Sequence, residues 1–125
     1  MKALLDTHTA ILLWEGRHEV FGVEATRVLE TYTLLLSPFS RLEMKYLLEI
    51  GRIVVEPDLI VGGLEADCGV AMTSGAVADV IAHAMSLSWT RDPFDRLLVA
   101  TAALQGTKFV TRDRTIRQHF VGAVW

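Results

Sequence analysis

The chain has 125 residues, of which 51% are hydrophobic and 22% are charged, and its formal net charge is −3. This composition excludes a disordered protein, the length suffices for one domain (residues 1–125) with a buried core, and no apolar run reaches the ~18–20 residues that cross a bilayer. The early aspartate in MKALLDTH argues against a signal peptide, and a single cysteine, Cys68, fits a protein of the reducing cytoplasm without membrane partners.

Short apolar segments alternate with amphipathic ones along the first half of the chain. Asp6 or Thr7 suits a helix cap, and Ser37-Pro38 suits a helix start. In chain order the sequence predicts a strand at 2–5, a helix at 9–14, a loop at 17–22, a helix at 23–30, a strand at 33–36, a helix at 38–50 and an extended piece at 53–55.

The second half continues the alternation. It predicts helices at 57–66, 74–86 and 93–104, a strand at 108–110, a short basic helix or turn at 114–120, and an apolar piece at 122–125 on the sheet edge. Strands that alternate with helices favour a mostly parallel sheet with helices on both faces. The residues expected to face the core are Val23, Val28 and Leu29 in one helix and Val77, Val80, Ile81 and Ala84 in another.

A glutamate interrupts the apolar stripe of the helix at 38–50. Glu43 lies in the middle of a stripe that we expect to face inward, and a carboxylate there is costly unless it is paired or binds a cation. Arg41 and Lys45 are poor partners, because residues two positions apart do not share a helix face. A partner on a neighbouring helix stays possible, but a functional Glu43 is favoured. The other members of the stripe are Phe39, Tyr46, Leu47 and Ile50.

Residues 90–113 carry three further aspartates. Asp92 suits a helix cap with Pro93 at the first helical position, and Asp95 then lies in the first turn, where the helix dipole favours an ionised carboxylate. Asp113 follows the strand at 108–110, at the end of a strand where open α/β sheets bind ligands. Taken alone, this pattern more often indicates a capped core helix followed by a polar turn.

Four acids therefore stand out along the chain: Asp6, Glu43, Asp95 and Asp113. Three of them occupy positions that a parallel sheet brings to one edge. Clustered carboxylates raise one another's pKa values unless a cation lies among them, and oxygen ligands without His or Cys select Mg²⁺ or Mn²⁺. Such a site suits the hydrolysis of phosphate esters. His83 is expected to be a surface histidine, because no second His or Cys stands at metal-binding spacing.

The segments LLDTH, SRLEMKYLLEIGRI, WTRDPFDRLLVATA and FVTRD and the final AVW closely resemble PIN-domain proteins, in particular the VapC-type toxins of bacteria. The resemblance implies a three-layer α/β/α sandwich with a mostly parallel sheet of about five strands. It also implies an acidic pocket for Mg²⁺ or Mn²⁺ and metal-dependent endoribonuclease activity. A small cognate antitoxin protein and a homodimer are the partners that it implies.

Carried over onto this sequence, the resemblance makes Asp6, Glu43, Asp95 and Asp113 both the catalytic and the metal-binding residues. Thr7 and Thr111 occupy positions of small hydroxyl residues that support the site. Whether Asp92 binds metal or only caps a helix stays open. The segment Phe39-Ser40-Arg41 replaces the small residues often found before the helical glutamate, so altered access to the pocket is expected.

Arginines gather in sequence around the acids of a chain that is otherwise net acidic. We expect them to bind RNA phosphates on either side of the cleaved bond. Unpaired RNA is the expected substrate, because an A-form duplex hides its base edges in a deep and narrow groove. These arginines are Arg91, Arg96, Arg112 and Arg114, with Arg117 nearby.

Two other functions fit part of the pattern. A receiver-like, magnesium-binding signalling domain needs two adjacent acids after its first strand and a late lysine. Here Asp6 is alone, Glu43 lies on a helix, and Lys108 lies inside a strand. A catalytically silent PIN module in an RNA-processing assembly is the third function, and no residue of the sequence favours it while all four acids are present.

Overall fold

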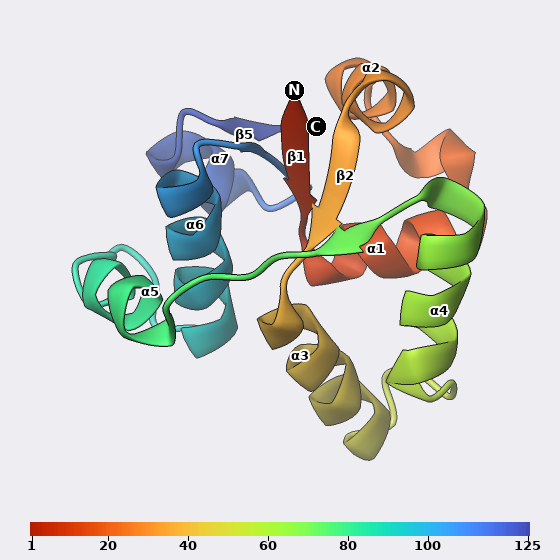
Figure 1. Ribbon diagram of the computed structural model, residues 1–125, viewed down its shortest axis with the longest axis horizontal. Helices are drawn as coiled ribbons and strands as arrows, with labels where there is room; N and C mark the ends of the chain where they lie inside the picture. The colour runs from red at the N-terminus through yellow and green to blue at the C-terminus, as the bar shows by residue number, and fades with distance from the viewer.

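A parallel sheet forms the centre of the structure, a computed structural model that describes residues 1–125 (Figure 1). No helix in it combines the length and the apolar composition that a membrane span requires. In chain order the elements are β1 (Lys2–Leu5), α1 (Thr7–Trp14), the 3-10 helix η1 (His18–Val20), α2 (Val23–Thr31), β2 (Thr33–Leu36), α3 (Pro38–Glu49), α4 (Pro57–Cys68), β3 (Ala71–Met72), α5 (Val77–Ala84), α6 (Pro93–Gln105), β4 (Lys108–Val110), α7 (Arg114–His119) and β5 (Ala123–Val124).

The five strands are arranged in the order β3-β2-β1-β4-β5, and every neighbouring pair is parallel. Leu4 in the central strand lies opposite Leu35 on one side and Phe109 on the other. The predicted parallel sheet is thereby confirmed. Because all strands run the same way, their carboxyl ends lie at one edge, where the residues that follow β1, β2, β4 and β5 meet.

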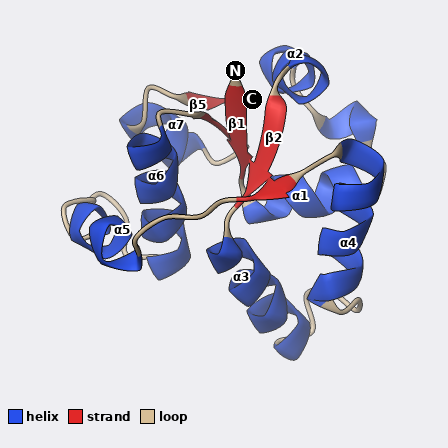
Figure 2. Cartoon of the chain, in the orientation of Figure 1, coloured by secondary structure: helices blue, strands red, loops and turns tan.

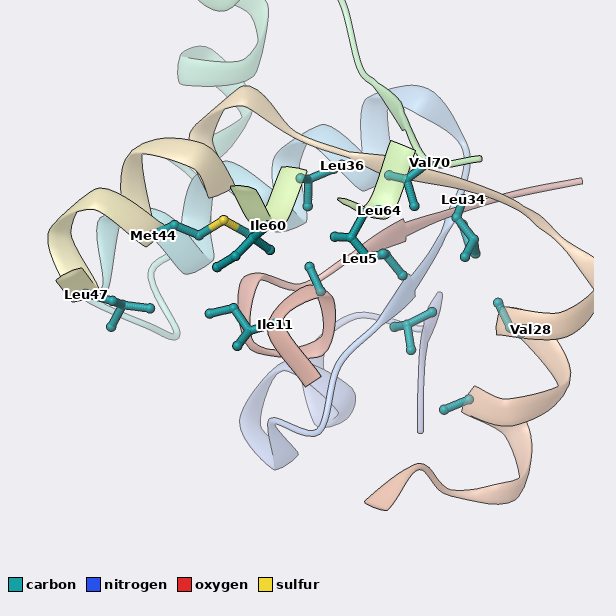
Figure 3. Packing of buried hydrophobic residues seen from close by; sticks show 14 residues of the cluster. Leu5, Ile11, Val28, Leu34, Leu36, Met44, Leu47, Ile60, Leu64 and Val70 are labelled. Atoms are coloured by element: carbon teal, nitrogen blue, oxygen red, sulfur yellow. The ribbon is translucent and has the colours of Figure 1, made fainter. Parts of the chain in front are cut away.

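Alternating strand residues divide the core into two layers, with helices on both sides of the sheet (Figure 2). On one face, Leu5 and Leu36 pack with residues of α1 to α4, among them Ile11 and Met44 (Figure 3). On the other face, Leu4, Leu35 and Phe109 pack against Leu98, Val99 and Ala102 of α6 and Ile116 of α7. Helix α5 lies outside α6 and packs on it rather than on the sheet (Figure 1).

Four helices begin at polar residues that cap them. Asp6, Ser37, Asp92 and Asp113 cap α1, α3, α6 and α7, and each side chain accepts a hydrogen bond from a backbone N–H of the first turn. At the other end of α6, Gly106 takes the left-handed conformation (φ 65°) that favours glycine. Three of these four caps directly or closely follow a strand, so the capping residues and the carboxyl edge of the sheet coincide.

The third strand is not where the sequence predicts extended structure. Residues 53–55 form no strand, and Val54 is 90% exposed; the strand that pairs with β2 is Ala71–Met72, and the helix predicted at 74–86 occupies only Val77–Ala84. A strand of two residues has no periodicity of its own to detect. It forms because Leu35 and Leu36 offer it backbone partners, which is a long-range effect.

Several residues that the sequence predicts to face the core are exposed instead, so these predictions are wrong. Val23, Val77 and Ile81 are exposed, and so are Tyr46 on α3 and Ile50 just after its end. For Val77 and Ile81 the cause is that α5 packs mainly on α6, so only one side of α5 is covered. The buried residues of these helices are Ala25 and Val28 in α2, Ser40, Glu43, Met44 and Leu47 in α3, and Val80 and Ala84 in α5.

Candidate active site

Asp6 is fixed at the carboxyl end of the central strand. It is only 7% exposed, and its oxygens accept hydrogen bonds from the Thr7 N–H (2.7 Å) and the Thr111 hydroxyl (2.5 Å). Burial raises the pKa of Asp6, and the bond from Thr111 opposes that rise. Two hydrogen bonds therefore set the orientation of a carboxylate that costs free energy to ionise.

Glu43 reaches the same region from α3. Its side chain is 8% exposed, as its position within the buried stripe predicts, and its Oε1 atom is buried without any hydrogen-bond partner. Burial raises the pKa of Glu43, the Thr7 side chain opposes that rise, and the negative charge of Asp6 adds to it. No cation of the chain pairs with Glu43, and the neighbouring-helix group that acts on it is the Thr7 side chain of α1.

The first turn of α6 supplies two more carboxylates. Asp92 accepts hydrogen bonds from the N–H groups of Phe94 (2.8 Å) and Asp95 (3.1 Å), so its capping role is observed. Asp95 is half-buried, and its pKa is raised to about 7, first by burial and then by the charges of Asp92, Asp6, Asp113 and Glu43. In the metal-free chain, burial and four neighbouring acids therefore outweigh the helix dipole that favours an ionised Asp95.

Thr111 links the last acid to the first. Its hydroxyl donates to Asp6 and accepts from the backbone N–H of Asp113 (3.1 Å). The Asp113 side chain caps α7 through the N–H of Ile116 (2.9 Å). Thr7 also has a supporting position: its hydroxyl donates to that of Ser40 (3.0 Å), and both residues are fully buried. Thr111 therefore holds Asp6 and the backbone of Asp113 in place, and Thr7 links the start of α1 to Ser40 of α3.

All five acids line one pocket of about 300 Å³. The structure thus brings together Asp6, Glu43, Asp95 and Asp113, and adds Asp92. Sequence reasoning missed other residues of the wall, although Trp125 follows the end of β5 as Asp6 follows the end of β1. None of Phe39, Ser40 and Arg41 lines the pocket, so the expected change in access has no structural basis. The residues missed are His8, Thr9, Leu12 and Trp125, and the predicted Arg112 completes the wall.

Of the predicted RNA-binding arginines, only Arg112 lines this pocket. Arg91 and Arg96 donate to the carbonyl oxygens of Ser88 (2.6 Å) and Thr90 (2.9 Å), and so brace the loop before α6. Arg114, at the start of α7, is exposed and forms no hydrogen bond or ion pair. Arg112 is therefore the one predicted RNA-binding arginine that lies at the acidic pocket, and the other three lie outside it.

The donor atoms and charges of the pocket suit a hard divalent cation. They are carboxylate oxygens, one of which, Oε1 of Glu43, is buried and unpartnered, and mutual repulsion contributes to the high pKa of Asp95. As the side chains lie, no three His, Cys, Asp or Glu residues are grouped so that they could hold a metal ion. Binding therefore requires these side chains to move closer together, with the positive charge of the ion offsetting their repulsion.

Fold and site define an α/β/α protein with an acidic pocket at the carboxyl edge of a parallel sheet. The sequence model of the PIN domain matches residues 3–119. Ribonuclease VapC22 of Mycobacterium tuberculosis (strain ATCC 25618 / H37Rv) is 32% identical over 119 residues, which cover 93% of this chain and 90% of that protein. The chain belongs to the PIN-domain family.

A solved structure supports the fold independently. The crystal structure of VapBC2 from Rickettsia felis bound to a DNA fragment from their promoter aligns with a TM-score of 0.66 at 10% identity, covering 99% of this chain and 96% of that one. The receiver-like alternative is wrong, because receivers have the strand order 2-1-3-4-5 and this sheet has β3-β2-β1-β4-β5.

Proposed function

We propose that the chain is a metal-dependent endoribonuclease that hydrolyses RNA phosphodiester bonds and acts as the toxin of a toxin–antitoxin pair, with residues 1–125 as its single PIN domain. The observation that carries this proposal is the convergence of five carboxylates, none of them in an ion pair, on one pocket. The similarity to a protein named Ribonuclease VapC22 supports it.

In this proposal Asp6, Glu43, Asp95 and Asp113 hold Mg²⁺ or Mn²⁺. A bound divalent ion lowers the pKa of water and neutralises negative charge that builds up on phosphate oxygens during hydrolysis. Thr111 holds the Asp6 carboxylate toward the site, since its hydroxyl bonds to Asp6 Oδ2. The Glu43 carboxylate has an oxygen free for the ion.

The remaining residues position the acids and the substrate. Asp92 holds the first turn of α6 through two hydrogen bonds, and so fixes the backbone that carries Asp95. Arg112 is the arginine placed to bind a phosphate group at the pocket, while Arg91, Arg96 and Arg114 contact RNA farther out. The substrate is unpaired or looped RNA, whose bases and backbone can enter a pocket of about 300 Å³.

The partners follow from the same assignment. We propose a small cognate antitoxin, a homodimer, and a cytoplasmic location where RNA is available. The structural similarity to VapBC2, which was crystallised with promoter DNA, supports the antitoxin. A short DNA-binding protein encoded by the neighbouring open reading frame would support it further, and co-purification of the two proteins tests it.

Cleavage of RNA by the purified protein tests the activity. Folded RNAs, tRNA included, are incubated with Mg²⁺, with Mn²⁺ or with EDTA, and the products are mapped for internal cuts. We expect cleavage only with a divalent metal, and none by Asp95→Asn. The matched control is Asp67→Asn, which removes an exposed carboxylate that has no hydrogen bond or ion pair.

Cleavage that persists in EDTA or in Asp95→Asn would contradict the proposed mechanism. Tight RNA binding without cleavage under all metal conditions would favour the catalytically silent PIN module instead.

A further inference from the structure

Trp125 stands at the acidic pocket because of the sheet register. β5 pairs in parallel with β4, with Val124 opposite Val110, and the Thr111 N–H donates to the Val124 carbonyl (3.1 Å). The next residue of each strand therefore reaches the carboxyl edge. Trp125 lines the pocket together with the five acids, and no other Trp, Tyr or Phe side chain lines it.

The surroundings of Trp125 hold its ring in place. Phe21 contacts the indole edge-on, with 5.4 Å between ring centroids and a 65° interplanar angle. The backbone passes so close at Gly22 that a Cβ there would lie 2.7 Å from the Trp125 carbonyl carbon. The side chain is partly buried against the larger core layer. A rigid aromatic wall beside a pocket loses little conformational entropy when a flat ligand stacks on it.

Arg112 lies over this ring instead of on an acid. Its guanidinium carbon is 5.9 Å from the Trp125 ring centroid, and Arg112 forms no ion pair although five carboxylates line the same pocket. Its backbone carbonyl accepts a hydrogen bond from Arg117 (3.3 Å). An arginine held by an aromatic ring keeps its N–H groups available for a phosphate.

We propose that Trp125 and Arg112 form a nucleotide subsite next to the acidic pocket, in which Trp125 stacks on an unpaired base and Arg112 binds the adjoining phosphate. The proposal rests on the proposed ribonuclease function and names its substrate subsite. The chemistry is complementary to the rest of the pocket: the acids repel a polyanion, so binding must come from an uncharged contact and a local cation. Base stacking is tolerant of sequence, because every base offers a π face.

The fluorescence of Trp125 reports on this contact directly. In the Trp14→Phe, Trp89→Phe, Asp95→Asn protein, Trp125 is the remaining tryptophan and cleavage is expected to be blocked. The probes are ten-residue oligoadenylate and oligouridylate, the ribose–phosphate chain of equal length without bases, and inorganic phosphate. We expect both oligonucleotides to change the fluorescence of Trp125 and to bind about tenfold more tightly than the baseless chain.

Two substitutions in the cleavage-competent chain separate stacking from packing. Trp125→Leu keeps apolar bulk and should raise KM about tenfold with kcat little changed, whereas Trp125→Phe keeps a ring and should raise KM by less than about threefold. Thermal melts establish whether the Leu variant folds. If it does not, the fluorescence measurement, which leaves residue 125 intact, still decides.

Equal affinity for the baseless chain, or no fluorescence change at saturation, would overturn the subsite. If Trp125 responds to the oligonucleotides but the wild-type chain cuts no RNA, the proposed ribonuclease fails and the subsite stands. If the chain cuts RNA while Trp125 is silent, only the subsite fails.

Discussion

Helix α3 separates two charged depressions that differ in how their charges are arranged. The groove between α3 and α4 is the larger, about 430 Å³, and its charges are paired: Arg41 with Asp58 (2.7 and 3.1 Å) and Lys45 with Glu56 (3.3 Å). The acidic pocket on the other side measures about 300 Å³ and contains five acids without one ion pair. Glu43 lies between Arg41 and Lys45 in sequence, yet it faces the other depression.

The difference shows that unpaired charge, and not volume, marks the candidate site. In the groove, hydrogen bonding to Arg41 lowers the pKa of Asp58, so the ionised form is already satisfied. In the pocket, burial raises the pKa values of Asp6, Glu43 and Asp95. The charges of the groove already have partners of opposite sign. The acids of the pocket have none, so binding a cation or protons there is favourable.

The strongest test exchanges one unpaired acid for its amide. We expect Glu43→Gln to reduce RNA cleavage by about a hundredfold or more, because a ligand of the ion is lost. The metal-free protein should remain as stable, or gain about 0.5–2 kcal/mol, because a buried carboxylate among like charges is removed. Rates at saturating metal and melts in EDTA measure the two effects.

The groove provides the matched control. Asp58→Asn changes the same kind of group on the paired side, and cleavage should stay within about twofold of wild type, since the residue lies outside the acidic pocket. A Glu43→Gln protein that lost several kcal/mol of stability would indicate a structural role for Glu43 instead.

Loss of a hydrogen bond that orients one of the acids should give the next largest decrease in cleavage. Thr111→Val removes the donor to Asp6 Oδ2 and should lower cleavage about 10–100-fold, because the carboxylate loses its fixed orientation. Thr107→Val is the control: its buried hydroxyl has no partner, so the variant should cleave normally and be at least as stable. Equal activities of the two variants would argue against the bracing role of Thr111.

Metal should stabilise the whole fold through the pocket. By linkage, Mn²⁺ or Mg²⁺ at a hundredfold excess over its Kd adds about 2.7 kcal/mol to the free energy of unfolding. Melting temperatures in Mn²⁺ and in EDTA measure this. Asp58→Asn should respond to metal as wild type does, and Glu43→Gln should respond less. Identical melting temperatures with and without millimolar metal would count heavily against a four-carboxylate site.

The pocket also predicts how the stability of the metal-free protein depends on pH. The pKa of Asp95 rises from 3.8 to about 7 on folding, so between these values the folded chain keeps a proton that the unfolded chain has released. The stabilisation is fully present below about pH 4 and is lost as the pH rises through about 7. In EDTA the melting temperature should therefore be higher at pH 5 than at pH 8.

Two comparisons sharpen this pH prediction. Asp95→Asn should remove most of the difference, and metal should reverse it, because an ion competes with the proton for the same oxygens. A metal-free melting temperature that increased from pH 5 to pH 8 would contradict the raised pKa.

Local sequence patterns predict most of the elements that build the pocket. Strands at 2–5, 33–36 and 108–110 are found at those bounds, because each is an apolar run ended by a polar residue. Asp6, Asp92 and Asp113 are recognisable as residues that follow strands or cap helices. Glu43 is recognisable because a carboxylate in an apolar stripe needs an explanation.

What the sequence does not predict depends on contacts between distant segments. β3 exists only as a partner of β2, and Trp125 reaches the pocket only because β5 aligns with β4. The pKa of Asp95 depends first on burial and then on four carboxylates, three of them from other elements, so the helix dipole alone does not predict the direction of its shift. His8 follows Thr7 directly, but only the turn into α1 places it on the pocket wall.

The smallest effect is expected from removing the Arg41–Asp58 ion pair of the groove. Arg41 and Asp58 form a two-point hydrogen-bonded pair, but both side chains are more than half exposed, with exposed fractions of 56% and 71%. Water screens such charges and the pair must order two flexible side chains, so its coupling is small despite good geometry. A double-mutant cycle of Arg41→Gln and Asp58→Asn, read by thermal melts, should give a coupling near the detection limit that vanishes in about 1 M salt. The same cycle in Mn²⁺ should be unchanged, because metal acts in the other depression. A large, salt-resistant coupling would mean that the paired charges also stabilise α3, and that the two sides of this helix are not independent.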